Sequence, residues 1–505
     1  MFKNIFTFSF FTAISRISGL IRDISIANII GASLLTDIFF SSFRLTNLFR
    51  AFFAEGAFTT AFIPLYSAKL YDKKLAYSFA SKILSITSIL LILFCLMMQI
   101  LTPHIIKIFS PGFVSSLNKF TLAVTLSRIM LPYILLISIA SLIGGMLQVN
   151  QNFIPTAISP IILNLCLIAS LFIPYVVTPA HNLAIAVLIG GIMQIILMIF
   201  SSYKLNINLC FNFKIDSEVK IFFKQSVPAI ISNCMTQISV WIDTIMASMI
   251  PNAVSYIYYA DRINQLPQGM IGTAIGTVLL PLISQQKNDT ENIIKIQNKA
   301  MNIGLILIIP ITAGLLIIPD IILTTLFSYG KFDPYAVQQT VPTLVALSLS
   351  SVPFTINKVL LPTFYMKGNF KIPTLFSIFC LLINILINIV LMNKRKHTGI
   401  AIATTTSTWI YSILLITYLK KNNLYNINQS ILNIIKVLIS TAIMSLFLFI
   451  ISNSLADMLY LKTIYFRFTV LLMLVLISAI IYLFTLCILL KKDLNDIKLM
   501  FKQEF

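Results

Sequence analysis

The sequence predicts an all-α polytopic membrane protein with about fourteen transmembrane helices: two six-helix lobes related by pseudo-two-fold symmetry, followed by two extra C-terminal helices. Three observations lead to this fold class. Hydrophobic residues make up 58% of the 505 residues and charged residues only 10%, whereas soluble domains carry about 25% charged residues. Apolar runs of about 20 residues, long enough to cross a hydrocarbon core, recur along the whole chain. Two stretches also resemble each other at one constant offset.

Each apolar run is expected to form one membrane span. The runs are centred near residues 18, 52, 92, 134, 164, 192, 235, 270, 308, 352, 382, 408, 441 and 475. The first run could be a secretory signal, but no small-x-small cleavage site follows it and it continues into Arg16 and Arg22. We therefore expect it to be retained as the first span.

The lysines indicate the orientation of the spans. With the N-terminus in the cytoplasm, the inside segments hold twenty lysines and the outside loops seven basic residues. Cytoplasmic loops of membrane proteins are enriched in lysine and arginine, so we expect both termini in the cytoplasm. The basic run near Lys394 is the one loop that fits badly. The net charge of +20 is then mainly a topology signal, with anionic membrane lipids rather than nucleic acid as its partner.

An internal repeat defines the lobes. The stretch Phe43 to Ser67 resembles Asp261 to Ser284, with Pro64 matching Pro281. "QNFIPT" recurs as "GNFKIPT", and Asn152 and Asn369 are separated by the same offset as the two prolines. Each copy holds six spans, so the copies should be related by an axis along the membrane normal, around a central cavity. The expected boundaries are 1–205 for the N-lobe, 206–421 for the C-lobe, and 422–505 for two further spans and a basic cytoplasmic tail.

Arginine is scarce and is concentrated in the apolar runs. The chain has eight arginines against twenty-eight lysines, and Arg16, Arg22, Arg50 and Arg262 lie inside predicted spans. An arginine at mid-membrane costs about 2.5 to 3.5 kcal/mol, so these side chains should line a water-filled cavity. The guanidinium fork binds carboxylate or phosphate in a bidentate way, which indicates an anionic substrate such as a phosphate or pyrophosphate. The alternative is that the arginines clamp helices together.

Acidic residues accompany these arginines. Asp23 follows Arg22, Asp37 begins the second span, Glu55 follows Arg50, and Asp261 precedes Arg262. We expect the acids to neutralise the arginines in the empty state and to form gating ion pairs between the lobes. The sequence contains no zinc motif, P-loop or nucleophile-elbow signature. A transporter is therefore favoured over an enzyme.

Two long stretches carry a family resemblance. "SRISGLIRDISIANIIGASLLTDIFFSSFRLTNLFRAFFAEGAFTTAFIPLYS" from Ser15, and "YYADRINQLPQGMIGTAIGTVLLPLIS" from Tyr258, resemble the MviN/MurJ family of lipid II flippases in the MOP exporter superfamily. The resemblance covers essentially the whole chain. It implies that the protein moves lipid II, the undecaprenyl-pyrophosphate-linked peptidoglycan precursor, from the inner to the outer leaflet of the bacterial cytoplasmic (inner) membrane by alternating access. Such a flippase serves cell wall biogenesis, and we expect it to be a monomer.

The resemblance also assigns residues. The family's cavity arginines fall on Arg16, Arg22, Arg50 and Arg262, and its acidic positions on Asp23, Asp37 and Glu55. Spans thirteen and fourteen are implied to form a groove for the lipid tail. Gln265 stands where the family often has an acid. Some members of the family have a sodium site. By the resemblance, this site would correspond here to Asp243, Asn384, Asn388 and Thr404. In the alternative, these polar groups hydrogen-bond between helices. No other cofactor is expected.

Two other transporters remain as alternatives. A flippase for another polyprenyl-pyrophosphate-linked oligosaccharide has the same charge requirements, and only the motif resemblance disfavours it. A MOP-type drug exporter for cations should carry acids and aromatic residues in its cavity, whereas the signal here is arginine. An enzyme of lipid-phosphate chemistry would need a nucleophile or general base near the arginines, and only isolated acids are present.

Overall fold

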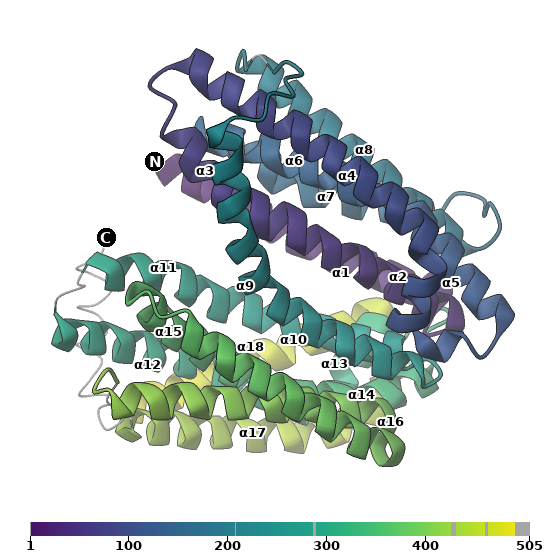
Figure 1. The fold of residues 1–505 in the computed structure, drawn as a ribbon. Coiled ribbons are helices and arrows are strands. Elements are labelled where there is room, and N and C mark those ends of the chain that lie inside the picture. The colour runs from purple at the N-terminus through teal and green to yellow at the C-terminus, as the bar shows by residue number, and fades with distance from the viewer. Residues whose placement is uncertain (1, 208, 286–288, 426–430, 460–462, 490–505) are drawn as a thin grey trace. The chain divides into compact units, whose positions relative to one another are not determined.

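The computed structural model describes the chain except residues 1, 208, 286–288, 426–430, 460–462 and 490–505, and its regular elements are helices (Figure 1). The structure also does not describe some side chains within helices, including that of Glu55. The chain divides into two compact units, Met1–Ser255 and Tyr256–Phe505. The expected basic tail lies outside the described residues.

The first unit is built mainly of long helices. Its elements are α1 (Phe2–Ile30), α2 (Leu34–Arg50), η1 (Ala51–Ala57), α3 (Phe58–Ser67), α4 (Lys73–Phe109), η2 (Pro111–Phe113), α5 (Leu117–Met130), α6 (Pro132–Val149), α7 (Ile154–Ser170), α8 (Pro179–Lys204) and α9 (Ser217–Ser248). The element η1 is a π-helix, so α2, η1 and α3 form one helical path.

The second unit continues the same pattern. Its elements are α10 (Ala253–Pro267), which begins just before the boundary, η3 (Gln268–Gly272), α11 (Thr273–Gln285), α12 (Thr290–Ile317), α13 (Pro319–Phe327), α14 (Pro334–Ser348), α15 (Ser351–Met366), α16 (Lys371–Lys421), α17 (Ile431–Leu459) and α18 (Ile464–Leu489). Lys396, at φ 49° and ψ −132°, divides α16 into two helices.

The helices agree with the predicted spans. Every one of the predicted span centres falls within a helix, including residue 52 in η1 and residue 270 in η3. In the described part of the chain, eight stretches are long and apolar enough to cross a membrane. One of these stretches, Lys371–Lys421, combines two predicted spans. The all-helical membrane fold is confirmed, and the number of crossings stays a prediction.

Aspartates begin several of the helices. Asp72, Asp216, Asp289 and Asp333 precede α4, α9, α12 and α14, and each accepts a hydrogen bond from a backbone N–H of the first turn. Such caps satisfy donors that have no partner inside the helix. These four acids therefore serve the ends of helices, where the chain enters a long apolar segment.

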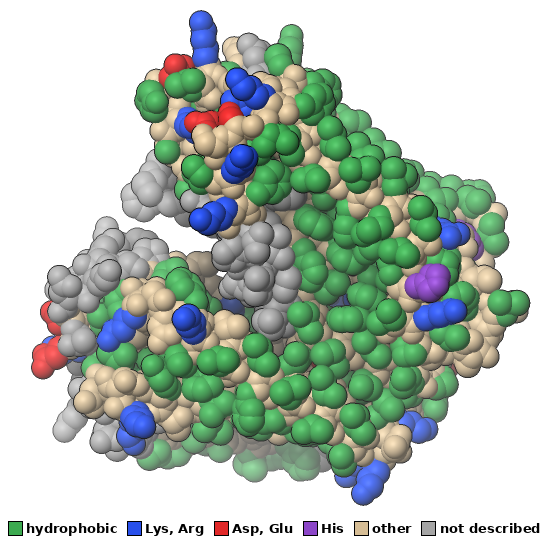
Figure 2. All heavy atoms as spheres, viewed as in Figure 1, with side chains coloured by type: hydrophobic (Ala, Val, Ile, Leu, Met, Phe, Trp, Pro, Cys, Tyr) green, Lys and Arg blue, Asp and Glu red, His purple; other side chains and the backbone are tan. Residues whose placement is uncertain are grey.

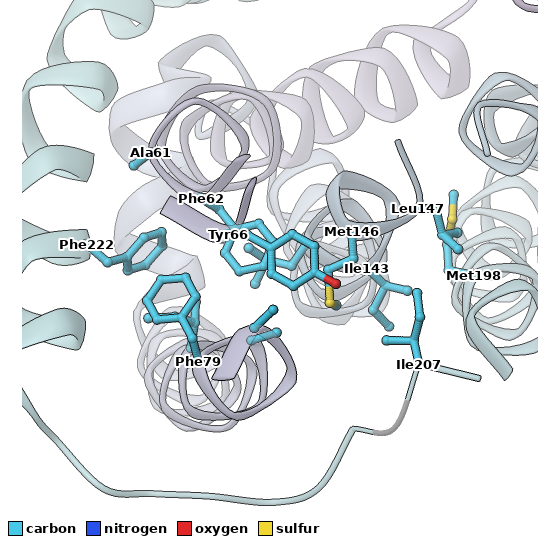
Figure 3. Packing of buried hydrophobic residues seen from close by; sticks show 14 of the residues in the cluster. Ala61, Phe62, Tyr66, Phe79, Ile143, Met146, Leu147, Met198, Ile207 and Phe222 are labelled. Carbon is cyan, nitrogen blue, oxygen red and sulfur yellow. The ribbon is translucent and has the colours of Figure 1, made fainter. Parts of the chain in front are cut away.

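Aromatic side chains form the core of the first unit. Phe62 and Tyr66 of α3, Phe79 of α4 and Phe222 of α9 are buried and lie close together (Figure 3). The rings of Phe62 and Phe79 stack at 5.9 Å between centroids, and Phe222 meets Phe62 edge-on at 6.5 Å. Because α9 contributes to this core, the first compact unit extends to Ser255. The expected lobe boundary at residue 205 stays a prediction.

Two apolar clusters form the core of the second unit. One joins α11, α12, α15 and the second half of α16, with Val359, Leu360 and Leu415 fully buried. The other joins α17 and α18 to α12 and α13. The two C-terminal helices therefore pack on the second unit through apolar side chains.

The sequence repeat appears as repeated local structure. The π-helix η1 begins at Ala51 and η3 begins at Gln268, and these positions are separated by the same offset as Pro64 and Pro281. A π-helix inserts a residue into the helical ladder and leaves backbone groups that need other partners. Both copies of the repeat therefore carry the same backbone irregularity.

Candidate functional site

Arg22 is a buried arginine whose donors are directed at protein acceptors. Its Nε and Nη2 donate to Asp23 Oδ1 at 2.9 and 2.7 Å, and its Nη1 donates to Asn164 Oδ1 at 3.0 Å. Arg22 is 6% exposed and Asp23 is fully buried. Asn164 in turn donates from Nδ2 to Ser18 Oγ at 2.9 Å. The side-chain amide of Asn164 therefore links α7 to α1, and the Arg22–Asp23 ion pair lies within α1.

Arg16 lies on the same helix in a different environment. Its side chain is exposed, as are the neighbouring side chains of Ile17 and Ile21. Among the described residues, no acid forms an ion pair with Arg16. Arg16 is thus accessible on the surface of α1, and its expected role in binding an anion stays a prediction.

Two further arginines lie on α2. Arg50 is half-buried and donates from Nε to Asn47 Oδ1 at 3.0 Å. Arg44 donates from Nη1 to Thr244 Oγ1 of α9 at 2.9 Å. Directly after Arg50 comes η1, and Ser141 of α6 donates to the Ala54 carbonyl inside it at 2.7 Å. Arg50 is thus anchored at the start of an irregular helical turn.

Asp37 is a buried acid at the start of α2. Its Oδ1 accepts hydrogen bonds from the Ser255 backbone N–H at 2.8 Å and from Ser255 Oγ at 2.5 Å. Ser255 lies in the first turn of α10, so the carboxyl group of Asp37 satisfies a donor that the helix itself leaves unpaired. This geometry gives Asp37 a capping role, and its expected gating role stays a prediction.

The substrate-binding and gating residues predicted in the second unit, Arg262 and Asp261, lie on α10. Asp261 and Arg262 are half-buried, and Asp261 Oδ2 accepts from Gln265 Nε2 at 2.6 Å. The neighbouring Asn264 is buried and bonds α15: its Nδ2 donates to Ser350 Oγ at 3.1 Å, and its Oδ1 accepts from Ser351 Oγ at 2.7 Å. The amides thus fix α10 against α15.

Lys358 is a basic residue that our sequence analysis did not consider. It lies on α15 inside the apolar stretch Pro334–Met366 and is half-buried. Its ammonium lies 5.4 Å from the centre of the Phe354 ring, and its aliphatic stem packs where Gly276 of α11 leaves room. No acid of the described residues pairs with it. The signal was available, because a lysine within an apolar span is itself a functional indicator.

The four residues of the candidate sodium site are divided between the two units. Asp243 is buried in the first unit. In the second unit Asn384 and Asn388 are buried one turn apart on α16, where Asn388 Nδ2 donates to Asn384 Oδ1 at 3.0 Å. Thr404 is half-buried and donates to the Ile400 carbonyl at 3.0 Å. Their oxygens are of the kind that hard cations select, and the assembly of a site from them stays a prediction.

An apolar cavity lies within the second unit. It has a volume of about 350 Å³ and is lined by α12, α13, α17 and α18. Its only polar side chains are those of Ser478 and Tyr482, whose hydroxyls donate to the carbonyls of Val475 and Ile306. A cavity with no free polar group in its lining suits a hydrocarbon chain.

Membrane-long helices in two units, with basic side chains inside apolar spans, define a polytopic membrane transporter. The structure is similar to the solved structure "Lipid II flippase MurJ, inward closed conformation", with a TM-score of 0.80 at 26% identity over 96% of this chain and 99% of that one. An inward-facing multidrug resistance MATE transporter of the MOP superfamily matches with a TM-score of 0.68 at 14% identity over 81% of this chain and 94% of that one. This second match shows the fold alone.

Sequence comparison identifies the family. The family model for lipid II flippase MurJ matches residues 26–488. A probable lipid II flippase MurJ of Rickettsia prowazekii is 35% identical over 91% of this chain and 92% of its own length. The lipid II flippase MurJ of Burkholderia cenocepacia is 30% identical over 84% and 85%. The chain belongs to the MurJ family of lipid II flippases, which confirms the resemblance and the expectation of a transporter rather than an enzyme.

Proposed function

We propose that this chain moves lipid II from the inner to the outer leaflet of the bacterial cytoplasmic membrane, with both of its termini in the cytoplasm. The observation that carries the proposal is the membership of this chain in a flippase family, together with basic side chains on its helices: Arg22 is buried on α1, and Lys358 lies inside the apolar stretch Pro334–Met366. A flippase must shield a charged headgroup from hydrocarbon, and it needs no covalent chemistry. Basic groups along the path supply that shielding for a pyrophosphate.

In the first unit, the exposed Arg16 is the side chain best placed to meet the pyrophosphate first. Its planar fork can donate two parallel hydrogen bonds to phosphate oxygens. Arg22 is already paired with Asp23 and Asn164. In this proposal the phosphate competes with Asp23 and Asn164 for Arg22, and loss of the hydrogen bond from Arg22 to Asn164 loosens the contact between α1 and α7. Coupling of this kind links substrate binding to a change in helix packing.

In the second unit, Arg262 and Lys358 provide two basic positions along the path. Lys358 packs beside Gly276, which follows Arg262 on the same helical path. The fourteen residues from 262 to 276 correspond to about 20 Å of helix. Two cations at different depths support stepwise movement of an anionic headgroup. The headgroup can pass from one cation to the other without being released into hydrocarbon. The apolar cavity beside α17 and α18 supports a place for the polyprenyl tail.

We also propose sodium as the coupling ion, with Asp243, Asn384, Asn388 and Thr404 supplying oxygen ligands. The amide oxygen of Asn384 accepts a hydrogen bond from Asn388, and a bound cation would replace that donor. Reconstituted protein should show transport that is stimulated by sodium, and Asp243→Asn should remove the stimulation while leaving the protein in the membrane. Unchanged sodium dependence in this variant would reject the site without affecting the assignment of lipid II.

Complementation tests the main proposal. A bacterium depleted of its own lipid II flippase would receive the wild type or one of the four variants Arg16→Lys, Arg22→Lys, Arg50→Lys and Arg262→Lys. We expect the wild type to restore growth and the lysine variants to fail at equal membrane abundance, because lysine keeps the charge and loses the bidentate fork. Arg128→Lys is the matched control: Arg128 donates to the Gln99 carbonyl at 3.2 Å, and its replacement should restore growth.

The outcomes separate the possible substrates. A wild-type protein that is abundant in the membrane and does not restore growth would favour the flippase for another lipid-linked oligosaccharide. Growth with all four lysine variants would mean that charge alone suffices, and the proposed bidentate binding of pyrophosphate would be wrong. Lys358→Gln adds the other basic position of the second unit, and we expect reduced growth if both Arg262 and Lys358 are needed.

A further inference from the structure

The segment between α8 and α9 carries exposed apolar side chains outside the helices. We call residues 209–216 the linker strand. Phe211, Phe213 and Ile215 are 88%, 54% and 65% exposed, and the rings of Phe211 and Phe213 stack with centroids 6.4 Å apart. Alternate residues of an extended chain point to one side. The linker strand therefore presents one apolar face, which soluble surfaces avoid unless something covers it.

The backbone of the linker strand is fixed against α4. The Cys210 N–H donates to Ser81 Oγ at 3.1 Å, and the Asn212 N–H donates to Ser85 Oγ at 2.9 Å. Two residues of extended chain advance about 6.6 Å, close to the 5.4 Å of one helical turn, so the strand can follow α4. At its end, Asp216 pairs with Lys82 at 2.5 Å. The hydrogen bond from Lys82 holds the pKa of Asp216 below its usual range.

The ends of the linker strand are also anchored. Ile207, just before it, and Phe222, just after it, are buried in the aromatic core of the first unit (Figure 3). Asp216 caps α9 by accepting from the Val219 N–H at 3.1 Å. The exposed apolar face is therefore a defined surface, held at both ends and along its length.

This surface lies beside the ends of the exposed apolar stripes of α4 and α8. On α4, a run of exposed apolar residues begins one turn after Ser85: Ile89, Leu90, Ile92, Leu93, Leu96, Met97 and Ile100. On α8 the exposed apolar residues end at Tyr203, and the ammonium of Lys204 lies 4.6 Å from the centre of the Phe200 ring. Tyrosine and lysine at the end of an apolar stripe are typical of the membrane–water interface.

The charge around the linker strand is positive. Exposed lysines surround it: Lys204, Lys214, Lys220 and Lys224. Among the described residues, none of these four has an acid within ion-pair distance, because Asp216 and Glu218 pair with Lys82 and Lys69. Figure 2 shows blue basic side chains gathered, with a few acids, at the end of the first unit that lies at the top of the view.

We propose that the linker strand is a binding surface for anionic phospholipid. Phe211, Phe213 and Ile215 insert at the level of the headgroups, and the neighbouring lysines bind lipid phosphate. An apolar wedge bordered by lysines is the combination that binds anionic membrane surfaces. The lysine distribution along the chain places this surface at the cytoplasmic leaflet, which carries the anionic lipids. A cytosolic protein could instead cover the same face, and the experiment separates the two.

A tryptophan placed in the linker strand reports its depth. Trp241 and Trp409, the two native tryptophans, are first replaced by phenylalanine, and Phe213→Trp is added. The protein is reconstituted in vesicles of phosphatidylcholine with a minority of phosphatidylglycerol, and one of the two lipids carries bromine near the headgroup. We expect strong quenching of the tryptophan fluorescence by brominated phosphatidylglycerol, beyond what its bulk fraction predicts. Aqueous iodide should quench weakly.

Leu96→Trp in the same background is the matched control. Leu96 is a lipid-facing residue of α4 far from the lysines of the linker strand. Its tryptophan should be quenched by either brominated lipid in proportion to the bulk fraction. If the Leu96→Trp protein showed the same preference for phosphatidylglycerol as the Phe213→Trp protein, the preference would be a property of the vesicles and not of the linker strand. This result would overturn the proposal.

Removing lysines tests the charge separately from the insertion. Lys204→Gln with Lys214→Gln should abolish the preference for phosphatidylglycerol while retaining quenching by lipid. Each lysine near an anionic surface contributes about fivefold in local enrichment. Native mass spectrometry provides a second measurement, on protein in which Phe213 is retained. The lysine variant should retain fewer anionic lipids than the wild type.

Two further results would overturn the proposal. If iodide quenches the Phe213→Trp protein strongly and neither lipid does, the linker strand lies in water. If cytosolic extract then protects the tryptophan from iodide, a protein partner covers the face. Equal retention of anionic lipids by the wild type and the lysine variant would reject the charged part of the site.

Discussion

The two copies of the repeat share a backbone and differ in their side chains. In the first copy α2, η1 and α3 follow one another, and in the second α10, η3 and α11 do. Asn47 and Asn264 occupy equivalent positions, as do Glu55 and Gly272, at the offset of the repeat. The π-helix begins at the same place in both. The irregular turn therefore belongs to the repeated architecture, and the acid Glu55 is present in the first π-helix and absent from the second.

The helices that lead into the two π-helices make different contacts. In the first copy, charged groups make the contacts: Arg44 donates to Thr244, and Asp37 accepts from Ser255. In the second copy, neutral amides make them, with Asn264 bonded to both Ser350 and Ser351. Neutral hydrogen bonds hold a helix without competing for an anionic ligand. Asn264 therefore fixes the helix that carries Arg262 through neutral groups, whereas the helix that carries Arg50 is fixed through charged ones.

The largest expected effect comes from moving a charge between the copies. Gly272→Glu gives the second copy the acid that the first copy has at Glu55. A Cβ at this glycine would lie 2.9 Å from Phe354 Cε1, and the position is buried. Overpacking costs about 1 to 3 kcal/mol and an unpaired buried charge several more. We expect a loss of at least about 3 kcal/mol of unfolding free energy, measured by thermal unfolding in detergent.

Gly272→Ala separates the steric effect from the charge. It adds only the Cβ, whose nearest neighbour is the movable ring of Phe354, so we expect no more than about 1 kcal/mol. Equal losses for the two variants would show that the charge itself is tolerated. The proposed neutral character of the second copy would then be wrong.

The next largest effect is expected at the amide that fixes α10. Asn264→Leu removes the bonds with Ser350 and Ser351, and two such bonds contribute about 2 kcal/mol together. The control is Gln265→Leu, one residue away on the exposed side of the helix, which should change stability by less than about 0.5 kcal/mol. A similar effect of both variants on thermal unfolding would contradict the role given to Asn264.

A smaller effect is expected at the acidic cap of the first copy. Asp37→Ala leaves the Ser255 N–H without its acceptor, and loss of a capping group costs about 1 to 2 kcal/mol. Asp37→Asn keeps an acceptor oxygen and should lose less than half as much. If hydrogen exchange at the Ser255 amide is unchanged in Asp37→Ala, the carboxyl group does not act as a cap.

Some of this architecture follows directly from the sequence. Apolar runs of sufficient length predict helices because a spanning chain must satisfy its backbone hydrogen bonds internally. The offset between Pro64 and Pro281 also predicts where the second π-helix begins once the first is known. The family resemblance and the transporter class follow from the motifs around Arg22 and Arg262, and the comparisons confirm both.

Other features depend on contacts between distant residues, which a single sequence does not reveal. Asn164 binds Arg22 across 142 residues, and Ser255 binds Asp37 across 218. Neither partner carries a charge, so charge patterns could not indicate them. The extension of the first unit to Ser255 also depends on long-range packing, that of Phe222 against Phe62. Lys358 was visible in the sequence, but its contact with Gly276 required the fold.

The smallest expected effect concerns the backbone of the first π-helix. Ser141 donates to the Ala54 carbonyl at 2.7 Å, and the second copy instead uses its own Thr273 hydroxyl on the Gly269 carbonyl. Ser141→Ala should cost about 1 kcal/mol, the net contribution of one hydrogen bond. Ser138 on the same helix is the matched control, because its buried hydroxyl has no described hydrogen-bond partner. Ser138→Ala should leave the unfolding temperature unchanged or raise it. If Ser138→Ala lowers the unfolding temperature as much as Ser141→Ala does, η1 needs no support from α6.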